Sequence, residues 1–190
     1  FRGADTIGKL ERLLSDISEV KVFDPACGSG NFLVIAYKEL RRLEHRILMR
    51  IEELDPASTG IFKLSGIRLD NFFGIEIDDF AHEIAILSLW LAKHQMNVEF
   101  HELFKVEISL IPLRDTGKVV CGNAARMDWT EVCPPSGQTF VCGNPPYQYG
   151  TKRTTDQSDD VLLALDDSSA SKYLDYVAIW LYKGAQFAVA

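Results

Sequence analysis

The chain has 190 residues, 47% of them hydrophobic, and a formal net charge of −7. This length suits one domain with a proper core. No apolar run reaches the ~18 residues of a membrane span, and no signal peptide opens the chain, so we expect a cytoplasmic protein without a membrane partner. The negative charge argues against a surface that binds nucleic acid throughout, because phosphate contacts need clustered Lys and Arg.

The cysteines give no sign of a metal site. Cys27, Cys121, Cys133 and Cys142 show no C-x-x-C spacing, and no His lies at ligand spacing from them. We therefore expect reduced, buried thiols and no metal. The most basic stretch, 38–50, also contains acidic residues and is typical of the solvated face of a helix.

The N-terminal third predicts a helix, a strand and a second helix. Residues 1–19 place apolar side chains at helical spacing. Val20, Val22 and Phe23 predict a buried strand, which Pro25 ends. A glycine-rich turn follows, and residues 31–54 continue as a long amphipathic helix.

The rest of the chain repeats this alternation. We expect further elements at 57–70 (loop), 72–77 (strand), 80–96 (helix), 118–121 (strand), 139–142 (strand) and 173–187 (helix). Val106, Ile108 and Leu110 suggest a short extra strand. Residues 148–171 are rich in Ser, Thr and Asp and predict a mobile loop, with 161–165 as a brief apolar exception.

Strands that alternate with helices predict a single α/β domain over 1–190, with a doubly wound and mainly parallel sheet. Such sheets bind ligands outside the carboxyl ends of their strands. Asp24, Glu76, Asp128 and Asn144 all fall at that edge. The turn at Gly28 and Gly30 favours a close approach of the backbone to a ligand.

A dinucleotide is the first alternative ligand, because Gly28-Ser-Gly30 begins a G-x-G-x-x-G pattern. Leu33 replaces its third glycine. The next acid at a strand end, Glu76, lies far beyond the ~20 residues that this fingerprint requires. The sequence therefore argues against a nicotinamide or flavin cofactor.

Four motifs occur in order along the chain: Asp24-Pro-Ala-Cys-Gly-Ser-Gly-Asn-Phe32, Gly74-Ile-Glu-Ile-Asp78, Gly122-Asn-Ala with Asp128-Trp129, and Asn144-Pro-Pro-Tyr147. This series resembles the class I S-adenosylmethionine-dependent methyltransferases, and most closely the gamma-type adenine-N6 DNA methyltransferases. The stretch from Phe72 to Asn97, with 174–178, is similar to large fused restriction–modification enzymes. The resemblance implies a Rossmann-like fold, S-adenosylmethionine as cofactor and DNA as partner.

The resemblance also implies a cofactor site made by Asp24, Ala26, Cys27, Gly28, Gly30, Phe32, Glu76, Ile77 and Asp128. Asp24 would meet the amino group of the cofactor, and the amides of the glycine turn would meet its carboxylate. Glu76 would accept hydrogen bonds from both ribose hydroxyls. Ile77 would pack on the adenine ring, and Asp128 would accept from its amino group.

The implied catalytic residues are Asn144, Pro145, Pro146 and Tyr147. The Asn144 side-chain oxygen and the Pro145 carbonyl would hold the target amino group, which is a poor nucleophile when left planar. The prolines fix the backbone that presents these acceptors. Tyr147 would stack on a base extruded from its duplex.

We therefore expect methyl transfer to adenine N6 in DNA. Methylation of RNA or of a protein glutamine, and a non-catalytic cofactor-binding module, remain the alternatives. We also expect a fragment of a longer protein, incomplete at both ends of the methyltransferase fold, whose DNA contacts lie in regions outside this chain. The oligomeric state and the target sequence stay open.

Overall fold

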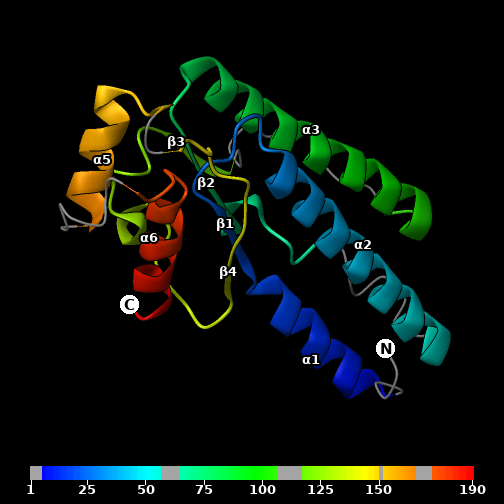
Figure 1. Cartoon of the computed structure of the whole chain (residues 1–190). Coiled ribbons are helices and arrows are strands. Elements are labelled where there is room, and N and C mark those ends of the chain that lie inside the picture. Colours follow the sequence, from blue (N-terminus) through cyan, green and yellow to red (C-terminus); the bar gives the residue numbers. More distant parts are fainter. Residues whose placement is uncertain (1–5, 57–64, 107–116, 150–151, 166–172) are drawn as a thin grey trace.

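The computed structural model of the chain describes residues 6–56, 65–106, 117–149, 152–165 and 173–190. Within them, helices and strands alternate along much of the chain (Figure 1). In chain order the elements are α1 (Ile7–Ser18), β1 (Lys21–Asp24), α2 (Asn31–Leu54), η2 (Leu69–Asn71), β2 (Phe72–Glu76), α3 (Asp79–Phe104), β3 (Lys118–Cys121), α4 (Trp129–Val132), β4 (Thr139–Val141), α5 (Thr155–Leu165) and α6 (Ala178–Ala188).

The four strands of the described chain form one parallel sheet in the order β3-β2-β1-β4. They coincide with the predicted strands to within one or two residues. The chain lays β2 and β3 on one side of β1 and then crosses to place β4 on the other side. The order therefore reverses between β1 and β4, where open α/β sheets bind their ligands. The prediction of a doubly wound, parallel α/β fold is confirmed.

Helices α1, α2 and α3 cover one face of the sheet (Figure 1). All three helices carry apolar stripes at helical spacing, and these stripes pack on the β-branched and aromatic side chains of the strands. The resulting core contains fully or almost fully buried side chains from helices and sheet, among them Leu10, Leu33, Phe72, Leu89 and Met96. This core supports the strand ends that carry the motifs.

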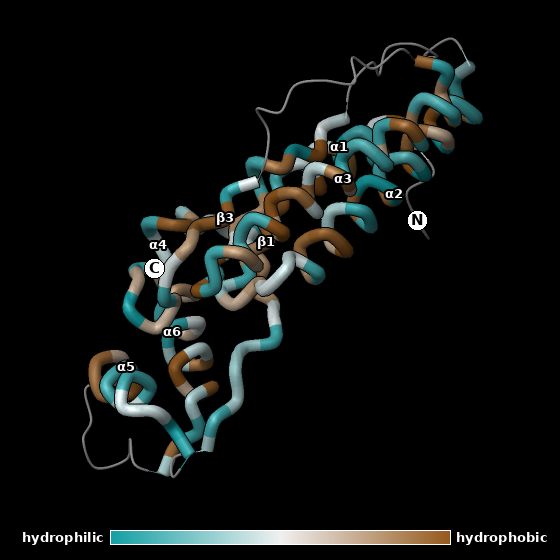
Figure 2. The backbone as a smooth tube through the Cα atoms, turned by 90° about the horizontal axis from the view of Figure 1, so that it is seen from above, coloured by the Kyte–Doolittle hydropathy of each residue, from teal (hydrophilic) through white to brown (hydrophobic). Residues whose placement is uncertain are grey.

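Helices α4 and α6 pack on the opposite face. The ring of Phe23 in β1 lies edge-on to Trp129 of α4, with centroids 5.5 Å apart, and 5.6 Å from the ring of Phe187 in α6. Helix α5 packs on α6 through buried Val161 and Ile179. Figure 2 shows α5 and α6 at the end of the molecule away from α2 and α3.

The charged stretch 38–50 of α2 is solvated at Glu39, Arg42 and Arg46, as predicted, but Arg41 and Glu44 are buried. Helix α3 runs past its predicted end and packs along α2, so Arg41 is only 1% exposed. Its guanidinium donates to the Tyr37 hydroxyl at 2.8 Å and to Asn97 Oδ1 at 3.1 Å, and it pairs with Glu44 at 3.2 Å. These partners compensate the burial of a charge.

The prediction of a mobile loop over 148–171 is wrong for Thr155–Leu165, which form α5. The Thr154 N–H donates to Gln157 Oε1 at 3.0 Å, and the Gln157 N–H donates to Thr154 Oγ1 at 3.2 Å. This reciprocal pair is a capping box, which stabilises the first turn of a helix. Residues 150–151 and 166–172 lie outside the described residues, as does most of the extra strand expected around Ile108.

Candidate active site

The glycine-rich turn after β1 folds back on β2 and leads into α2. The Cys27 N–H donates to the Ile75 carbonyl at 3.0 Å, and the Gly30 N–H donates to the Cys27 carbonyl at 2.8 Å. Gly28 and Gly30 have φ values of +54° and +84°, which favour glycine. A Cβ at Gly30 would lie 3.2 Å from the Cα of Ala85 in α3. The turn therefore brings the start of α2 to the carboxyl edge of the sheet.

Glu76, the last residue of β2, joins two strand ends. Its Oε2 accepts from the Gly28 N–H at 2.7 Å, and its Oε1 accepts from the Asp78 N–H at 2.9 Å. Each oxygen keeps a further lone pair, so the carboxylate can still accept from a ligand. Ile77 follows with 67% of its side chain exposed. A carboxylate and an apolar surface thus lie next to each other.

Asp24, the last residue of β1, is completely buried. Its Oδ1 accepts from the Ala26 N–H at 3.0 Å, whereas its Oδ2 has no hydrogen-bond partner in the described part of the chain. Burial raises the pKa of Asp24 to about 6, with a further contribution from the charge of Glu76 and an opposing one from the Ala26 N–H. A Cβ at Gly143 would collide with this carboxylate. Asp24 therefore lies directly behind the segment that leaves β4.

That segment passes through Gly143, with a φ of +146°, into 144–147. Asn144 is exposed, and so is Tyr147. Beyond them, the Gln148 N–H donates to Asp175 Oδ1 at 2.9 Å, and the Tyr176 N–H donates to the Gln148 carbonyl at 3.0 Å. The segment is therefore held by β4 at one end and by the start of α6 at the other.

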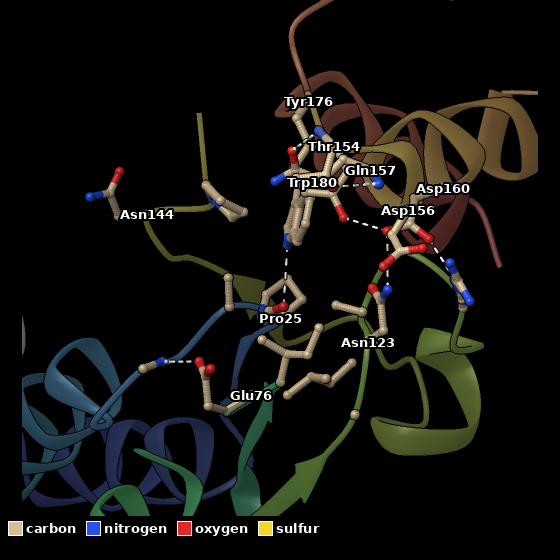
Figure 3. Close-up of a pocket in the computed structure, with 18 residues that line it drawn as sticks. Pro25, Glu76, Asn123, Asn144, Thr154, Asp156, Gln157, Asp160, Tyr176 and Trp180 are labelled. Carbon is tan, nitrogen blue, oxygen red and sulfur yellow. Dashed lines mark hydrogen bonds and ion pairs between the residues drawn. The ribbon is translucent and has the colours of Figure 1, made fainter. Parts of the chain in front are cut away.

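A cavity of about 670 Å³ opens at this edge of the sheet (Figure 3). Its size falls in the range of small-molecule sites. In Figure 3, Glu76, Asn144 and the start of α5 lie on different sides of the space. Six of the predicted site residues line it, namely Ala26, Gly28, Glu76, Ile77, Asn144 and Pro146.

The other predicted residues do not line the cavity: Asp24, Cys27, Gly30, Phe32, Pro145, Tyr147 and Asp128. Asp24 and Cys27 are buried behind its wall. Burial raises the pKa of the Cys27 thiol to about 12, which keeps it neutral. The Phe32 side chain is 47% exposed on α2.

Asp128 caps α4 instead of facing the cavity. Its Oδ1 accepts from the Thr130 N–H at 2.8 Å and from Thr130 Oγ1 at 2.7 Å. These hydrogen bonds lower the pKa of Asp128. Asn123 lies earlier in the same segment between β3 and α4, and it lines the cavity whereas Asp128 does not.

Comparison with known proteins identifies the family. Residues 2–190 match the family described as MmeI, DNA-methyltransferase domain. The chain belongs to this family. It is 46% identical over 187 residues to DNA methyltransferase A of Bacillus subtilis (strain 168), a match that covers 97% of this chain and 21% of that protein.

The chain is also similar to a solved structure of the Type IIL restriction-modification enzyme MmeI in complex with DNA. The TM-score is 0.88 at 34% identity, over 98% of this chain and 25% of that one. The predicted relation to the methyltransferase region of restriction–modification enzymes is confirmed. This MmeI-family domain spans a quarter or less of the length of these relatives.

One cluster of this MmeI-family domain was not predicted from its motifs. Asp160 of α5 accepts hydrogen bonds from the Tyr176 hydroxyl at 2.6 Å, from Asn123 Nδ2 at 3.1 Å and from Arg126 Nε at 2.5 Å. Burial acts to raise the pKa of Asp160, but these donors outweigh it and the pKa is lowered. All four side chains line the cavity. The capping box at the start of α5 indicates the helix in the sequence. No sequence pattern indicates that Asn123, Arg126 and Tyr176 contact Asp160.

Neither a metal-ion cluster nor a membrane-spanning helix is found among the described residues of this MmeI-family domain. No group of three or more His, Cys, Asp and Glu side chains lies close enough together to hold a metal ion. Neither α2 nor α3, nor any shorter helix in the described ranges, combines the length and the apolar character needed to cross a bilayer.

Proposed function

We propose that this chain binds S-adenosylmethionine and transfers its methyl group to N6 of adenine in DNA, as the catalytic domain of a restriction–modification enzyme. One observation carries the proposal. The cavity at the reversal of strand order has Glu76 and Gly28 on one side and Asn144 on another. Membership of the MmeI DNA-methyltransferase domain family supports DNA as the polymer that is modified.

The groups around the cavity fit this cofactor. Glu76 keeps lone pairs for two ribose hydroxyls, and the exposed Ile77 offers an apolar surface for an adenine ring. The amides at the start of α2 suit a carboxylate. Asp24 has a free Oδ2 in the described part of the chain, but it is buried behind the wall, so we assign it no direct contact with the cofactor in this conformation. When bound, the cofactor supplies a methyl group on a positively charged sulfur.

Asn144 and the backbone of Pro145 have the chemistry that the acceptor amino group needs. The lone pair of an exocyclic amino group is delocalised into its ring, which makes the nitrogen a weak nucleophile. Two acceptors, Asn144 Oδ1 and the Pro145 carbonyl, hold its two hydrogens and favour a pyramidal nitrogen aimed at the methyl group. The nitrogen would gain the methyl group as its bond to the cofactor sulfur breaks, S-adenosylhomocysteine would leave, and one N–H proton would pass to solvent, so no covalent enzyme intermediate is required.

Tyr147 is 67% exposed and follows the two prolines. An exposed ring beside Asn144 can stack on a base that has left its duplex, which is worth ~1–3 kcal/mol per base. Extruding the base costs a few kcal/mol, which contacts to the DNA backbone must offset. We propose that these contacts and the reading of the target sequence reside in the full-length protein outside this chain, which carries a net charge of −7.

The decisive experiment incubates the full-length protein with S-adenosylmethionine labelled on its methyl group, and with DNA, RNA or protein as acceptor. N6-methyladenine in DNA is the expected product. Label in RNA or on protein glutamine alone would contradict the choice of acceptor. Cofactor binding without transfer to any of the three would identify a non-catalytic module.

A further inference from the structure

Helix α6 and the turn before it hold three separate parts of the cavity wall. Tyr176, Trp180 and Lys183 follow one another at spacings of four and three residues, which places them on one side of a helix. The Trp180 indole N–H donates to the Pro25 carbonyl in the turn after β1, at 3.2 Å. Lys183 Nζ donates to the carbonyls of the turn after β3, at Ala125 (3.0 Å) and Met127 (2.6 Å).

The third contact is that of Tyr176 with Asp160, and it joins α6 to α5. Asp160 is 2% exposed and accepts from three donors, of which Asn123 and Arg126 belong to the turn after β3. Three segments that are distant in sequence thus converge on one buried carboxylate. Removing the charge would weaken the acceptor of the buried Tyr176 hydroxyl, and a buried donor left without an acceptor costs more than the net value of the bond itself.

Helix α5 is also the wall of the cavity opposite the strand ends. Thr154, which precedes α5, and Asp156 and Gln157 in its first turn line the cavity. Asn123, which follows β3, lies on the same side (Figure 3). Thr154 and Gln157 are fixed relative to each other by the capping box. The first turn therefore moves as a unit, and Asp160 lies one turn further along the same helix.

We propose that Asp160 is a positioning residue that fixes α5 over the end of β3 and so completes the cofactor pocket. The inference rests on the proposed function, because it takes the ligand of this cavity to be S-adenosylmethionine. We assign Asp160 no role in the chemistry at Asn144, because its side chain is 2% exposed and directed at three donors of the chain. Its effect is on how tightly the cofactor is held.

The key variant is Asp160→Asn, which keeps the size of the side chain but replaces one acceptor oxygen with a donor. Asp159→Asn is the matched control, because Asp159 is the exposed neighbour on the same helix and loses the same charge. Tyr176→Phe removes a single donor and serves as a milder variant that keeps the fold. Thermal unfolding of each variant shows that the comparison is made between folded proteins.

Two measurements test the inference in the full-length protein. Hydrogen exchange without ligand should show faster exchange of the α5 amides in Asp160→Asn, and unchanged exchange in Asp159→Asn. Calorimetry with S-adenosylhomocysteine should show a Kd about tenfold higher for Asp160→Asn. The control should stay within about twofold. Tyr176→Phe should shift both readouts in the same direction by less.

Steady-state kinetics separate positioning from general loss of structure. Asp160→Asn should raise KM for S-adenosylmethionine about tenfold with kcat changed little, because an interaction made equally in the ground and transition states is lost. Asp160→Glu, which restores a carboxylate, should recover part of the affinity. Proportional loss of active protein would instead lower the apparent kcat and leave KM unchanged, and that result would contradict the inference.

Different results would overturn the proposed function and the positioning role of Asp160. A wild-type protein that does not bind S-adenosylhomocysteine would overturn the proposed function and, with it, the assignment of the pocket. A wild-type protein that binds, together with an Asp160→Asn variant of unchanged affinity, would overturn the positioning role alone. Unchanged exchange of α5 in Asp160→Asn would show that apolar packing at Val161 holds the helix without the carboxylate.

Discussion

The cavity has two walls that are built by different means. The wall at the strand ends consists of Glu76, Gly28 and the turn after β1, whose backbone N–H groups donate to the Ile75 carbonyl and to the Glu76 carboxylate of β2. The wall made by α5 and α6 depends on side chains that meet across long stretches of sequence, as in Asp160 with Asn123 and Trp180 with Pro25. Substitutions of single side chains should therefore leave the first wall in place and displace the second.

The largest expected effect concerns neither wall but the segment between them. Asn144→Ala in the full-length protein should lower kcat for DNA methylation by a factor on the order of 10²–10³, as removal of one preorganised polar group does elsewhere. The Kd for S-adenosylhomocysteine should stay unchanged, because the proposed role of Asn144 is toward the base alone. Tyr147→Phe is the control, since stacking needs the ring and not the hydroxyl. A Phe variant as inactive as Asn144→Ala would exclude a pure stacking role.

Asp24, behind the first wall, should make stability depend on pH. Its pKa of about 6 in the folded state is above the ordinary value of 3.8 for an aspartate, so the folded state binds more protons than the unfolded state between these values. Stability should therefore fall as pH rises from 4 to 6, by at most about 3 kcal/mol.

The measurement for Asp24 is urea unfolding of the wild type and of Asp24→Asn across this pH range. The difference between the two should grow in favour of the variant as pH rises from 4 to 6, and it should be constant above pH 7. A difference that stays the same at every pH would show that folding does not raise the pKa of Asp24.

Glu76→Gln tests the first wall itself. The variant keeps the length of the side chain but loses its charge, and it should raise the Kd for S-adenosylhomocysteine about tenfold or more. Asp79→Asn is the control, because Asp79 is an exposed acid in the first turn of α3. Calorimetry measures the Kd of each variant for S-adenosylhomocysteine. Equal affinities for wild type and Glu76→Gln would remove Glu76 from the cofactor site.

The smallest effect should come from a single attachment of the second wall. Trp180→Phe keeps an aromatic ring but removes the N–H that donates to the Pro25 carbonyl. We expect the free energy of unfolding to drop by about 1 kcal/mol, with Tyr182→Phe on the exposed side of α6 as control. Equal losses for both variants would assign the effect to ring packing.

The contrast between the walls also explains what the sequence could predict. The strand, glycine turn and helix from Val20 to Leu54 are encoded by neighbouring residues, so they and the four parallel strands could be placed from local patterns. Glu76 and Ile77 reach the cavity because a strand end fixes their position. Asn144 and Pro146 could be placed at the cavity in the same way, because they follow the end of β4.

Side chains whose direction is set by particular hydrogen-bond partners or by packing escaped this reasoning. Asp128 follows a strand as expected, but Thr130 provides nearer donors and turns it into a helix cap. Arg41 carries a charge typical of a solvated face, yet α3 covers it. The polar composition of 148–171 predicts a loop, but Thr155–Leu165 form α5, and the contacts of Asp160 that hold this helix come from residues more than ten positions away.

The tie between Gln148 and the start of α6 gives this helix a second role. The segment that carries Asn144 is anchored to α6 through Asp175 and Tyr176, and the same helix holds the turn after β1 through Trp180. In the proposed reaction, the acceptor side and the donor side are therefore both attached to α6. A small tilt of α6 would move both sides together and preserve the distance over which the methyl group is transferred. A substitution that removes only one of these hydrogen bonds would change that distance.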